Sequence, residues 1–359
     1  MSSSSAGAVT LQVLGSGSAL PGHAISTDEL LGHFAEYLPI GAANKAKRIA
    51  RRLGIENRHI ARALREPVEA VNPEHSAPQL AARATHAALQ QAGMPVASLG
   101  FLIGHTATPH TPLPSNTAWT ADVLEYPGPH VELRQACTGF AAAVVLANGP
   151  ISSSRQPVAI AGSETGSVYF DPRLVTAEPD QLVNMVQMGD GAGAIILGPL
   201  LDTAASRIEI PYFGSLGLGR APGLMLGAGG SSRPQIGNGG LAHFSHDYAA
   251  IREHGMDLLR AGLDAAEGLG VHRDSVDWFL PHQANGRMAE LCAAHLHLPA
   301  ERVICDAKAL GNLGSAAIWV SLDRLRRSGR LARGDRVLVL GAEATKFMYG
   351  GFLYVHGRS

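Results

Sequence analysis

Apolar positions along this 359-residue chain fall into short runs that alternate with longer segments of helical spacing. Helical spacing is clearest in Ser76–Gly93, where Leu80, Ala84 and Leu89 share one face. Short apolar runs bounded by glycine and proline indicate buried strands. The expected strands are Val9–Leu14, Gly100–Gly104, Pro157–Gly162, Ala194–Leu197, Val276–Leu280, Asp335–Leu340 and Gly351–Val355, and further helices are expected at Asn116–Leu124, Ala249–Gly268, Arg287–His297 and Ala316–Arg327.

Ser26 and Thr27 precede a segment with helical spacing and with carboxylates in its first turn, which predicts that one of these two residues caps a helix. Strands that alternate with helices over the whole chain indicate an α/β architecture. Segments without a clear period are expected to be loops or irregular structure: Gly15–Gly22, His105–Ser115, Glu164–Gln187 and Gly341–Tyr349. The glycine-rich Ile208–Gly240 is expected to hold a strand and a loop.

The stretch Val131–Asn148 carries the most informative pattern. Alternation over Val131–Arg134 predicts a strand, and the apolar run Phe140–Leu146 predicts a buried helix. Cys137 therefore lies at a strand-to-helix corner, where free backbone N–H groups favour a thiolate. The alternative is a buried cysteine that acts only as a small hydrophobic side chain.

Composition and charge argue against several classes of protein. The hydrophobic content of 46% with 16% charged residues is typical of a globular protein, and the net charge of −1 argues against a nucleic-acid-binding protein. Three cysteines are too few for a disulfide framework. The chain has no apolar run of about 18 residues and no secretory signal pattern, so we expect a cytoplasmic protein that does not span a membrane.

The segment Asn44–Arg65 is the most basic part of the chain. Gly54 and Ile55 interrupt it, so its arginines flank a turn, an arrangement that suits bidentate phosphate binding. The alternative is a solvated helix face. By contrast, the glycine-rich Gly189–Leu197 lacks the ending of a phosphate loop and precedes a strand, so we expect a tight turn there.

His282 directly follows an expected strand, and Asn312 precedes an expected helix. In α/β folds, side chains converge on a site at such strand ends and helix starts. Cysteine, histidine and asparagine together suggest acyl transfer, in which a thiolate attacks a thioester and the other two side chains donate to developing negative charge. A cysteine protease uses the same residue types, but its local sequence signature is absent around Cys137.

The ordered motifs resemble those of β-ketoacyl-acyl-carrier-protein synthase III, a family of the thiolase superfamily. The resemblance extends over nearly the whole chain. The matching segments are LPGHAISTDEL at 20–30, GIENRHI at 54–60, QACTGF at 135–140, GDGAGA at 189–194, PHQAN at 281–285 and GN at 311–312.

This resemblance implies a thiolase-like α/β fold of two similar halves, residues 1–200 and 201–359. Each half would hold a five-stranded mixed sheet between helices, giving αβαβα layers, and the protein would be a homodimer. Cys137 would take the acyl group from a CoA or carrier-protein thioester. His282 and Asn312 would bind a malonyl-type donor during decarboxylation, and the N–H of Cys137 would form half of the oxyanion hole.

The same resemblance implies substrate-binding roles for four further residues. Arg52 matches an arginine at the CoA nucleotide, and Asn285 matches an asparagine beside the pantetheine. Arg287 matches a basic residue at the tunnel mouth, near which the acyl carrier protein docks. Leu113 stands where some members carry a phenylalanine that closes the acyl pocket across the dimer. No cofactor or metal is expected, because the CoA or phosphopantetheine thioesters are substrates.

Two departures from the family pattern stand out. Arg48 replaces a tryptophan that stacks on adenine. The loop that normally supplies the second oxyanion donor is a glycine run, and here it reads GAEATK at 341–346. Within it, Glu343 is expected either to form a structural ion pair, for example with Lys346, or to act as a base toward an acceptor.

Three functions follow as hypotheses. The first is decarboxylative condensation in fatty-acid or secondary-metabolite biosynthesis. The second is transfer of the Cys137-bound acyl group to an alcohol or amine without C–C bond formation. The third is a non-catalytic partner subunit, against which the presence of Cys137, His282 and Asn312 argues.

Overall fold

The computed structural model describes residues 9–228 and 244–357. Its strands are β1 (Thr10–Ala19), β2 (Ile25–Ser26), β3 (Asn57–Arg58), β4 (Phe101–His105), β5 (His130–Leu133), β6 (Val158–Glu164), β7 (Gly191–Pro199), β8 (Arg207–Ser215), β9 (Leu224–Leu226), β10 (Phe244–His246), β11 (Trp278–Pro281), β12 (Arg336–Glu343) and β13 (Met348–Val355). Its α-helices are α1 (Thr27–His33), α2 (Ala42–Leu53), α3 (Ala77–Ala92), α4 (Asn116–Leu124), α5 (Gly139–Ser154), α6 (Asp180–Gln187), α7 (Tyr248–Gly268), α8 (Met288–Leu296), α9 (Ala307–Leu310) and α10 (Ala317–Arg327). The strand expected at the start of 208–240 is β8, and the rest of that segment lies partly outside the described residues.

A mixed sheet forms the centre of the molecule. In the described residues it has nine strands in the order β11-β12-β13-β8-β1-β7-β6-β4-β5. From β1 outward, the pairings with β7, β6 and β4 are antiparallel, antiparallel and parallel. From β8 outward, the pairings with β13, β12 and β11 follow the same pattern. The expectation of two similar α/β halves is therefore confirmed, although the two halves show no visible sequence repeat.

The two halves are joined where β1 pairs with β8 in antiparallel register. The first half supplies the five expected strands, and the described part of the second supplies four. The division at residue 200 stays a prediction, and it falls in the connection between β7 and β8.

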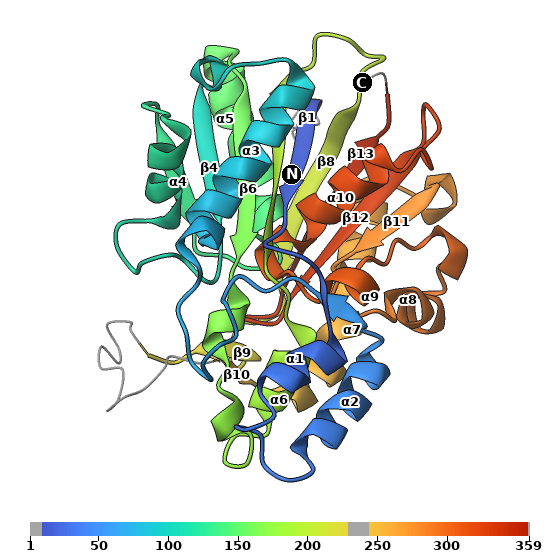
Figure 1. Cartoon of the computed structure of the whole chain (residues 1–359). Helices are drawn as coiled ribbons and strands as arrows, with labels where there is room; N and C mark the ends of the chain where they lie inside the picture. The colour runs from blue at the N-terminus through green and yellow to red at the C-terminus, as the bar shows by residue number, and fades with distance from the viewer. Residues whose placement is uncertain (1–8, 229–243, 358–359) are drawn as a thin grey trace.

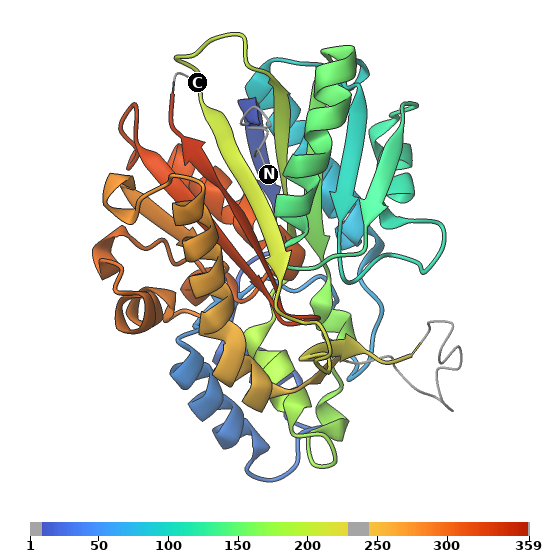
Figure 2. The same ribbon diagram turned by 180° about the vertical axis from the view of Figure 1, so that it is seen from behind.

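Each half of the sheet lies between helices. Helix α3 covers the outer face of the first half (Figure 1) and α7 covers the outer face of the second (Figure 2), whereas α5 and α10 pack together in one core cluster with strands of both halves. At the junction of the halves, the Phe140 ring at the start of α5 lies 5.9 Å from the Trp319 ring of α10. Helices α1, α2 and α6 gather below the sheet in Figure 1, around an apolar cluster that includes Leu30, Phe34 and Phe170.

Several local predictions are confirmed. Ser26 caps α1 and accepts the N–H of Glu29 at 3.1 Å. Helix α3 begins after Ser76 and ends at Gly93, whose φ of 65° is easily adopted by glycine. Helix α4 has the expected bounds. All three cysteines are free.

The prediction of a turn over Gly15–Gly22 is wrong for its first half, since β1 continues to Ala19. Gly15 and Gly17 face α3 at very short range. A Cβ at Gly15 would lie 2.1 Å from the carbonyl oxygen of Ala88, so glycine permits helix and strand to approach there. Local sequence could not separate this use of glycine from a turn.

Two further loop predictions need correction. The segment Glu164–Gln187 is not irregular throughout, since it ends in α6. The segment Gly341–Tyr349 is mostly strand, because β12 runs to Glu343 and pairs with β13, with Glu343 opposite Met348. Only Ala344–Phe347 form the turn, so Glu343 has a side-chain direction fixed by strand alternation.

Candidate functional site

Cys137 follows β5 and directly precedes the first turn of α5, as predicted. It is partly exposed, whereas its neighbours Ala136 and Thr138 are buried. No other residue in the described part of the chain accepts its backbone N–H, so this donor can serve an oxyanion.

The expectation that this corner favours a thiolate is wrong. Burial, followed by the charges of Glu343 and Glu164, raises the pKa of Cys137 well above its usual value. Glu343 also accepts the N–H of Thr138 at 2.9 Å, so this donor at the start of α5 serves a carboxylate rather than the sulfur. Sequence spacing could not reveal carboxylates that arrive from β6 and β12.

Glu164, the last residue of β6, holds the segment that follows Asn312 against this strand. Its side chain is buried and accepts the N–H and the hydroxyl of Ser315 at 2.9 and 2.7 Å. It also accepts the hydroxyl of Thr108. Burial raises the pKa of Glu164. Sequence reasoning missed this residue, because nothing local distinguishes it from any carboxylate at a strand end.

Gln187, at the end of α6, brings the segments of His282 and Asn312 together. Its backbone carbonyl accepts the N–H of Asn312 at 2.8 Å, and its side-chain amide donates to the carbonyl of Ala284 at 2.9 Å. The N–H of His282 donates to Leu340 of β12 at 2.7 Å. Gln187 therefore brings the segments of His282 and Asn312 together, and Glu164 joins the Asn312 segment to β6 and lies close enough to Cys137 for its charge to act on the sulfur.

His282 is buried, and burial lowers its pKa to about 4. The imidazole is neutral at pH 7, and its Nδ1 has no hydrogen-bond partner in the described residues. The side-chain oxygen of Asn312 accepts the N–H of Gly314 at 3.0 Å, which fixes the orientation of the amide. A neutral imidazole can accept a proton or donate one.

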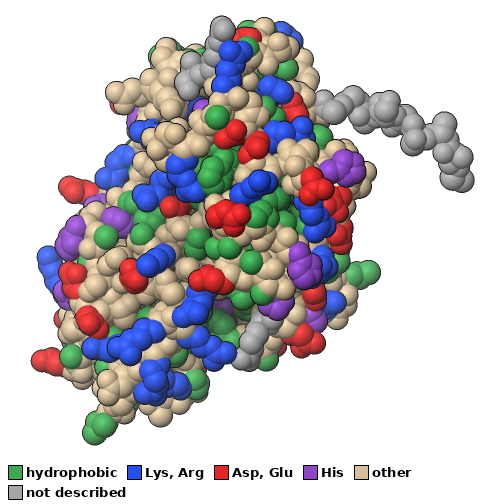
Figure 3. All heavy atoms as spheres, turned by 90° about the vertical axis from the view of Figure 1, so that its right-hand side faces the viewer, with side chains coloured by type: hydrophobic (Ala, Val, Ile, Leu, Met, Phe, Trp, Pro, Cys, Tyr) green, Lys and Arg blue, Asp and Glu red, His purple; other side chains and the backbone are tan. Residues whose placement is uncertain are grey.

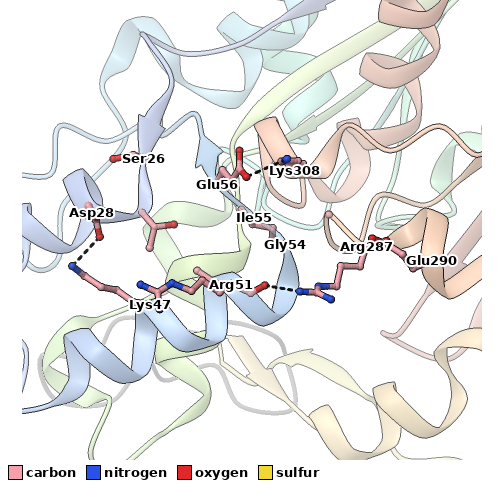
Figure 4. A pocket seen from close by; sticks show the side chains of 13 residues that line it. Ser26, Asp28, Lys47, Arg51, Gly54, Ile55, Glu56, Arg287, Glu290 and Lys308 are labelled. Carbon is pink, nitrogen blue, oxygen red and sulfur yellow. Dashed lines mark hydrogen bonds and ion pairs between the residues drawn. The ribbon is translucent and has the colours of Figure 1, made fainter.

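A pocket of about 550 Å³ lies beside these segments (Figure 4). Two of its walls meet where the N–H of Gly286 donates to Leu53 at 2.8 Å, and a Cβ at Gly286 would collide with the carbonyl of Gly54. Its charged lining residues are Lys47, Arg51, Arg287 and Lys308 together with Asp28, Glu56 and Glu290. On the molecular surface, Lys and Arg gather near the bottom of the view in Figure 3, beside scattered Asp and Glu.

Part of this positive charge is already paired. Lys47 lies 2.9 Å from Asp28, and Lys308 lies 3.2 Å from Glu56. Arg287 reaches the backbone carbonyl of Arg51 at 3.3 Å. The guanidinium of Arg51 has no ion-pair partner in the described part of the chain, so it is the cation most available to an anionic ligand.

The substrate-binding predictions have different outcomes in this geometry. Arg287 lines the pocket, whereas Arg52 is exposed on α2 and is not among the lining residues. Asn285 accepts the N–H of Arg287 at 2.9 Å. Leu113 is 87% exposed in the segment between β4 and α4. The binding roles themselves stay predictions.

Two arginines of the basic segment are buried, which corrects its interpretation as a uniformly available phosphate-binding edge. Arg58 donates to the carbonyl of Val186 at 2.8 Å. Arg62 stacks on Phe170 at 4.4 Å and on Phe34 at 5.1 Å. Both hold the α1, α2 and α6 region together.

The comparisons with known proteins agree with this fold. Family models described as 3-oxoacyl-[acyl-carrier-protein] synthase III match residues 131–211, and the C-terminal model of that family matches residues 266–353. The chain is 30% identical over 349 residues to the β-ketoacyl-[acyl-carrier-protein] synthase III of Sphingopyxis alaskensis, covering 95% of both chains. The chain belongs to this family.

Two other members of the wider group are informative. A 3-oxopimeloyl-[acyl-carrier-protein] synthase of Rhodothermus marinus is 31% identical, with 92% of this chain and 90% of that protein covered. The structure of AbyA1, described as a tetronic acid condensing enzyme, has a TM-score of 0.81 at 26% identity and covers 96% of this chain and 99% of its own. The synthase is thus an acyl-transferring condensing enzyme of fatty-acid or secondary-metabolite biosynthesis.

Buried histidines make the stability of this synthase depend on pH. Burial lowers the pKa of His105, His246 and His282 to about 4, and it raises that of Asp190 to about 6. Below pH 6.5 these histidines bind protons in the unfolded state but stay neutral in the native state, so the free energy of unfolding falls as the pH falls. By pH 5 each of the three histidines lowers the free energy of unfolding by about 2 kcal/mol, and Asp190 raises it by about 1 kcal/mol.

We therefore expect urea unfolding between pH 7 and pH 5 to show a falling free energy of unfolding. His105→Gln should flatten the dependence, whereas His33→Gln, at an exposed position, should leave it unchanged. A free energy that stays constant or rises on acidification would contradict the expectation.

Proposed function

We propose that Cys137 carries the acyl group and that His282 and Asn312 serve the condensation. The observation that supports this most directly is that Gln187 joins the segments of His282 and Asn312, while Glu164, bound to Ser315, acts by its charge on Cys137. Family membership supplies the reaction class, and these contacts support the proposed roles.

Acyl loading forms a bond between the Cys137 sulfur and the carbonyl carbon of the donor thioester and breaks the donor's C–S bond. Because the Cys137 pKa is raised, its proton needs an acceptor as the bond forms. We assign that role to the neutral His282, which then returns the proton to the departing thiol.

Condensation begins when a malonyl-type thioester loses CO₂. Negative charge develops on its thioester oxygen, where His282 and the Asn312 amide act as donors. The resulting carbanion attacks the acyl carbonyl on Cys137, and the C–S bond breaks to release the β-ketoacyl product. The free N–H of Cys137 stabilises the acyl oxygen during this attack.

The proposed condensation is tested by following CO₂ release and ketone product together. With an acyl donor and a malonyl-type thioester, we expect one CO₂ for each β-ketoacyl product. Acyl transfer to an alcohol or amine without CO₂ release would replace this function by the transferase alternative.

The pocket beside α2 fits the phosphate-bearing part of a CoA or carrier-protein thioester. Since Arg51 lines this pocket and Arg52 does not, we expect Arg51→Glu to raise the KM for the acyl donor about tenfold, with a smaller effect of Arg52→Glu. Steady-state kinetics at two salt concentrations measure both, because screening should weaken donor binding by the wild-type protein. Equal KM values for wild type and Arg51→Glu would remove the pocket from donor binding.

The homodimer belongs to the same proposal. Strand β5 ends the sheet, and its Val131 is 39% exposed, close to α4, whose Val123 is 36% exposed. An open edge strand with exposed apolar side chains is suited to pairing with another chain. Leu113 projects from the neighbouring segment and would then reach a partner's acyl pocket.

Among the helices that the structure describes, none has the length and apolar character needed to cross a bilayer.

A further inference from the structure

Glu343 stands at the end of β12 and points toward the Cys137 corner. Gly341, two residues earlier, faces α5 so closely that a Cβ there would lie 2.7 Å from the Phe140 ring. Strand alternation puts Glu343 on this same side and Ala342 on the opposite side, in the cluster beneath α7. The direction of Glu343 is therefore a consequence of the strand and not of a flexible loop.

The carboxylate of Glu343 is 2% exposed and joins two segments. One oxygen accepts the N–H of Thr138 at 2.9 Å and its hydroxyl at 2.7 Å. The other accepts the hydroxyl of Thr345 in the turn after β12. The Thr138 hydroxyl also accepts from Gln135 at 2.9 Å, so its proton is directed at Glu343. All three partners are donors, as an acceptor-only carboxylate requires.

The expected ion pair between Glu343 and Lys346 is not formed. The Lys346 ammonium donates instead to the carbonyl of Arg220 at 2.5 Å. In the described part of the chain, the carboxylate is satisfied by hydroxyl and amide donors alone, and its negative charge has no cationic neighbour in contact.

We propose that Glu343 is a positioning residue of the condensation site. Its carboxylate clamps the Ala344–Phe347 turn onto the start of α5, and its negative charge beside Cys137 lowers the reactivity of the sulfur in the free protein. The inference rests on the proposed role of Cys137. A glycine run at this turn has no side chain with which to make either contact.

The groups around Cys137 support the effect on the sulfur. Burial raises the pKa of Cys137, and the charges of Glu343 from β12 and Glu164 from β6 raise it further. His105 packs against Gly139, and its pKa, like that of His282, is lowered to about 4, so neither histidine supplies a compensating positive charge at pH 7. Removal of one of the two negative charges should therefore make the thiolate easier to form.

The test measures the rate at which iodoacetamide alkylates Cys137 as a function of pH. The readout is peptide mass spectrometry, which separates Cys137 from Cys292 and Cys305. Glu343→Gln preserves the shape of the side chain and removes its charge. We expect this variant to react about tenfold faster at pH 7 and the midpoint of its pH profile to move to lower pH. Glu132→Gln, which removes a carboxylate on β5 that binds Thr117 and Arg134, should keep the wild-type profile.

A second variant separates charge from folding. Glu343→Asp keeps the charge but shortens the clamp, so it should keep a high alkylation midpoint while losing condensation rate. If Glu343→Gln does not fold, Glu343→Met supplies an uncharged side chain of similar length. A folded, uncharged variant with the wild-type alkylation profile would overturn the proposal. Alkylation needs no acyl substrate, so this result is independent of whether Cys137 proves to be the acylated residue.

Discussion

Cys137→Ala is expected to abolish acylation of the protein by thioester donors. Of the three cysteines, Cys137 alone stands at the corner between β5 and α5, whereas Cys292 is buried in the cluster beneath α7 and the Cys305 thiol lies against the carbonyl of Asn285. An alanine at the start of α5 preserves the helix and removes only the nucleophile. Intact-protein mass spectrometry after incubation with acyl-CoA and acyl-carrier thioesters measures the loss.

Cys292→Ala and Cys305→Ala are the matched controls, and both should still gain the acyl mass. Persistent acylation of Cys137→Ala at stoichiometric level would assign the nucleophile to another residue. A control variant that loses acylation while remaining folded would do the same.

His282→Ala is expected to lower the condensation rate by about 10² to 10³, the usual effect of losing one donor to a developing oxyanion. If the helix start favoured a thiolate, as the sequence predicts, loading would not need His282. Burial and the charges of Glu343 and Glu164 instead raise the pKa of Cys137, so we expect its thiol to need a base. Loading by His282→Ala should therefore also be slow at pH 7 and recover as the pH rises.

Asn312→Ala provides the contrast. Its amide accepts from Gly314 and has no part in proton removal from Cys137, so loading should stay fast while condensation falls by a similar factor. Rapid-quench mass spectrometry of the acyl-enzyme, combined with CO₂ release, separates the two steps. Fast loading by His282→Ala at pH 7 would show that another group takes the thiol proton.

The sequence established the residues and their local settings. Apolar runs and helical spacing gave most elements of the α/β fold, and Ser26 and Gly93 marked helix ends that the structure confirms. Cys137 at a strand-to-helix corner, His282 after a strand and Asn312 before a helix were also visible, because each depends on neighbours within a few positions. These are short-range properties, which local pattern encodes.

Tertiary structure alone decided what surrounds those residues. Gly15 and Gly341 looked like turn residues, but they permit close packing against α3 and α5, which are formed by distant segments. Burial, together with the charges of Glu343 from β12 and Glu164 from β6, raises the pKa of Cys137, the opposite of the direction expected from the helix start. Burial and charge at a point depend on every segment that the fold brings there, so local periodicity identifies the nucleophile but cannot determine its protonation state.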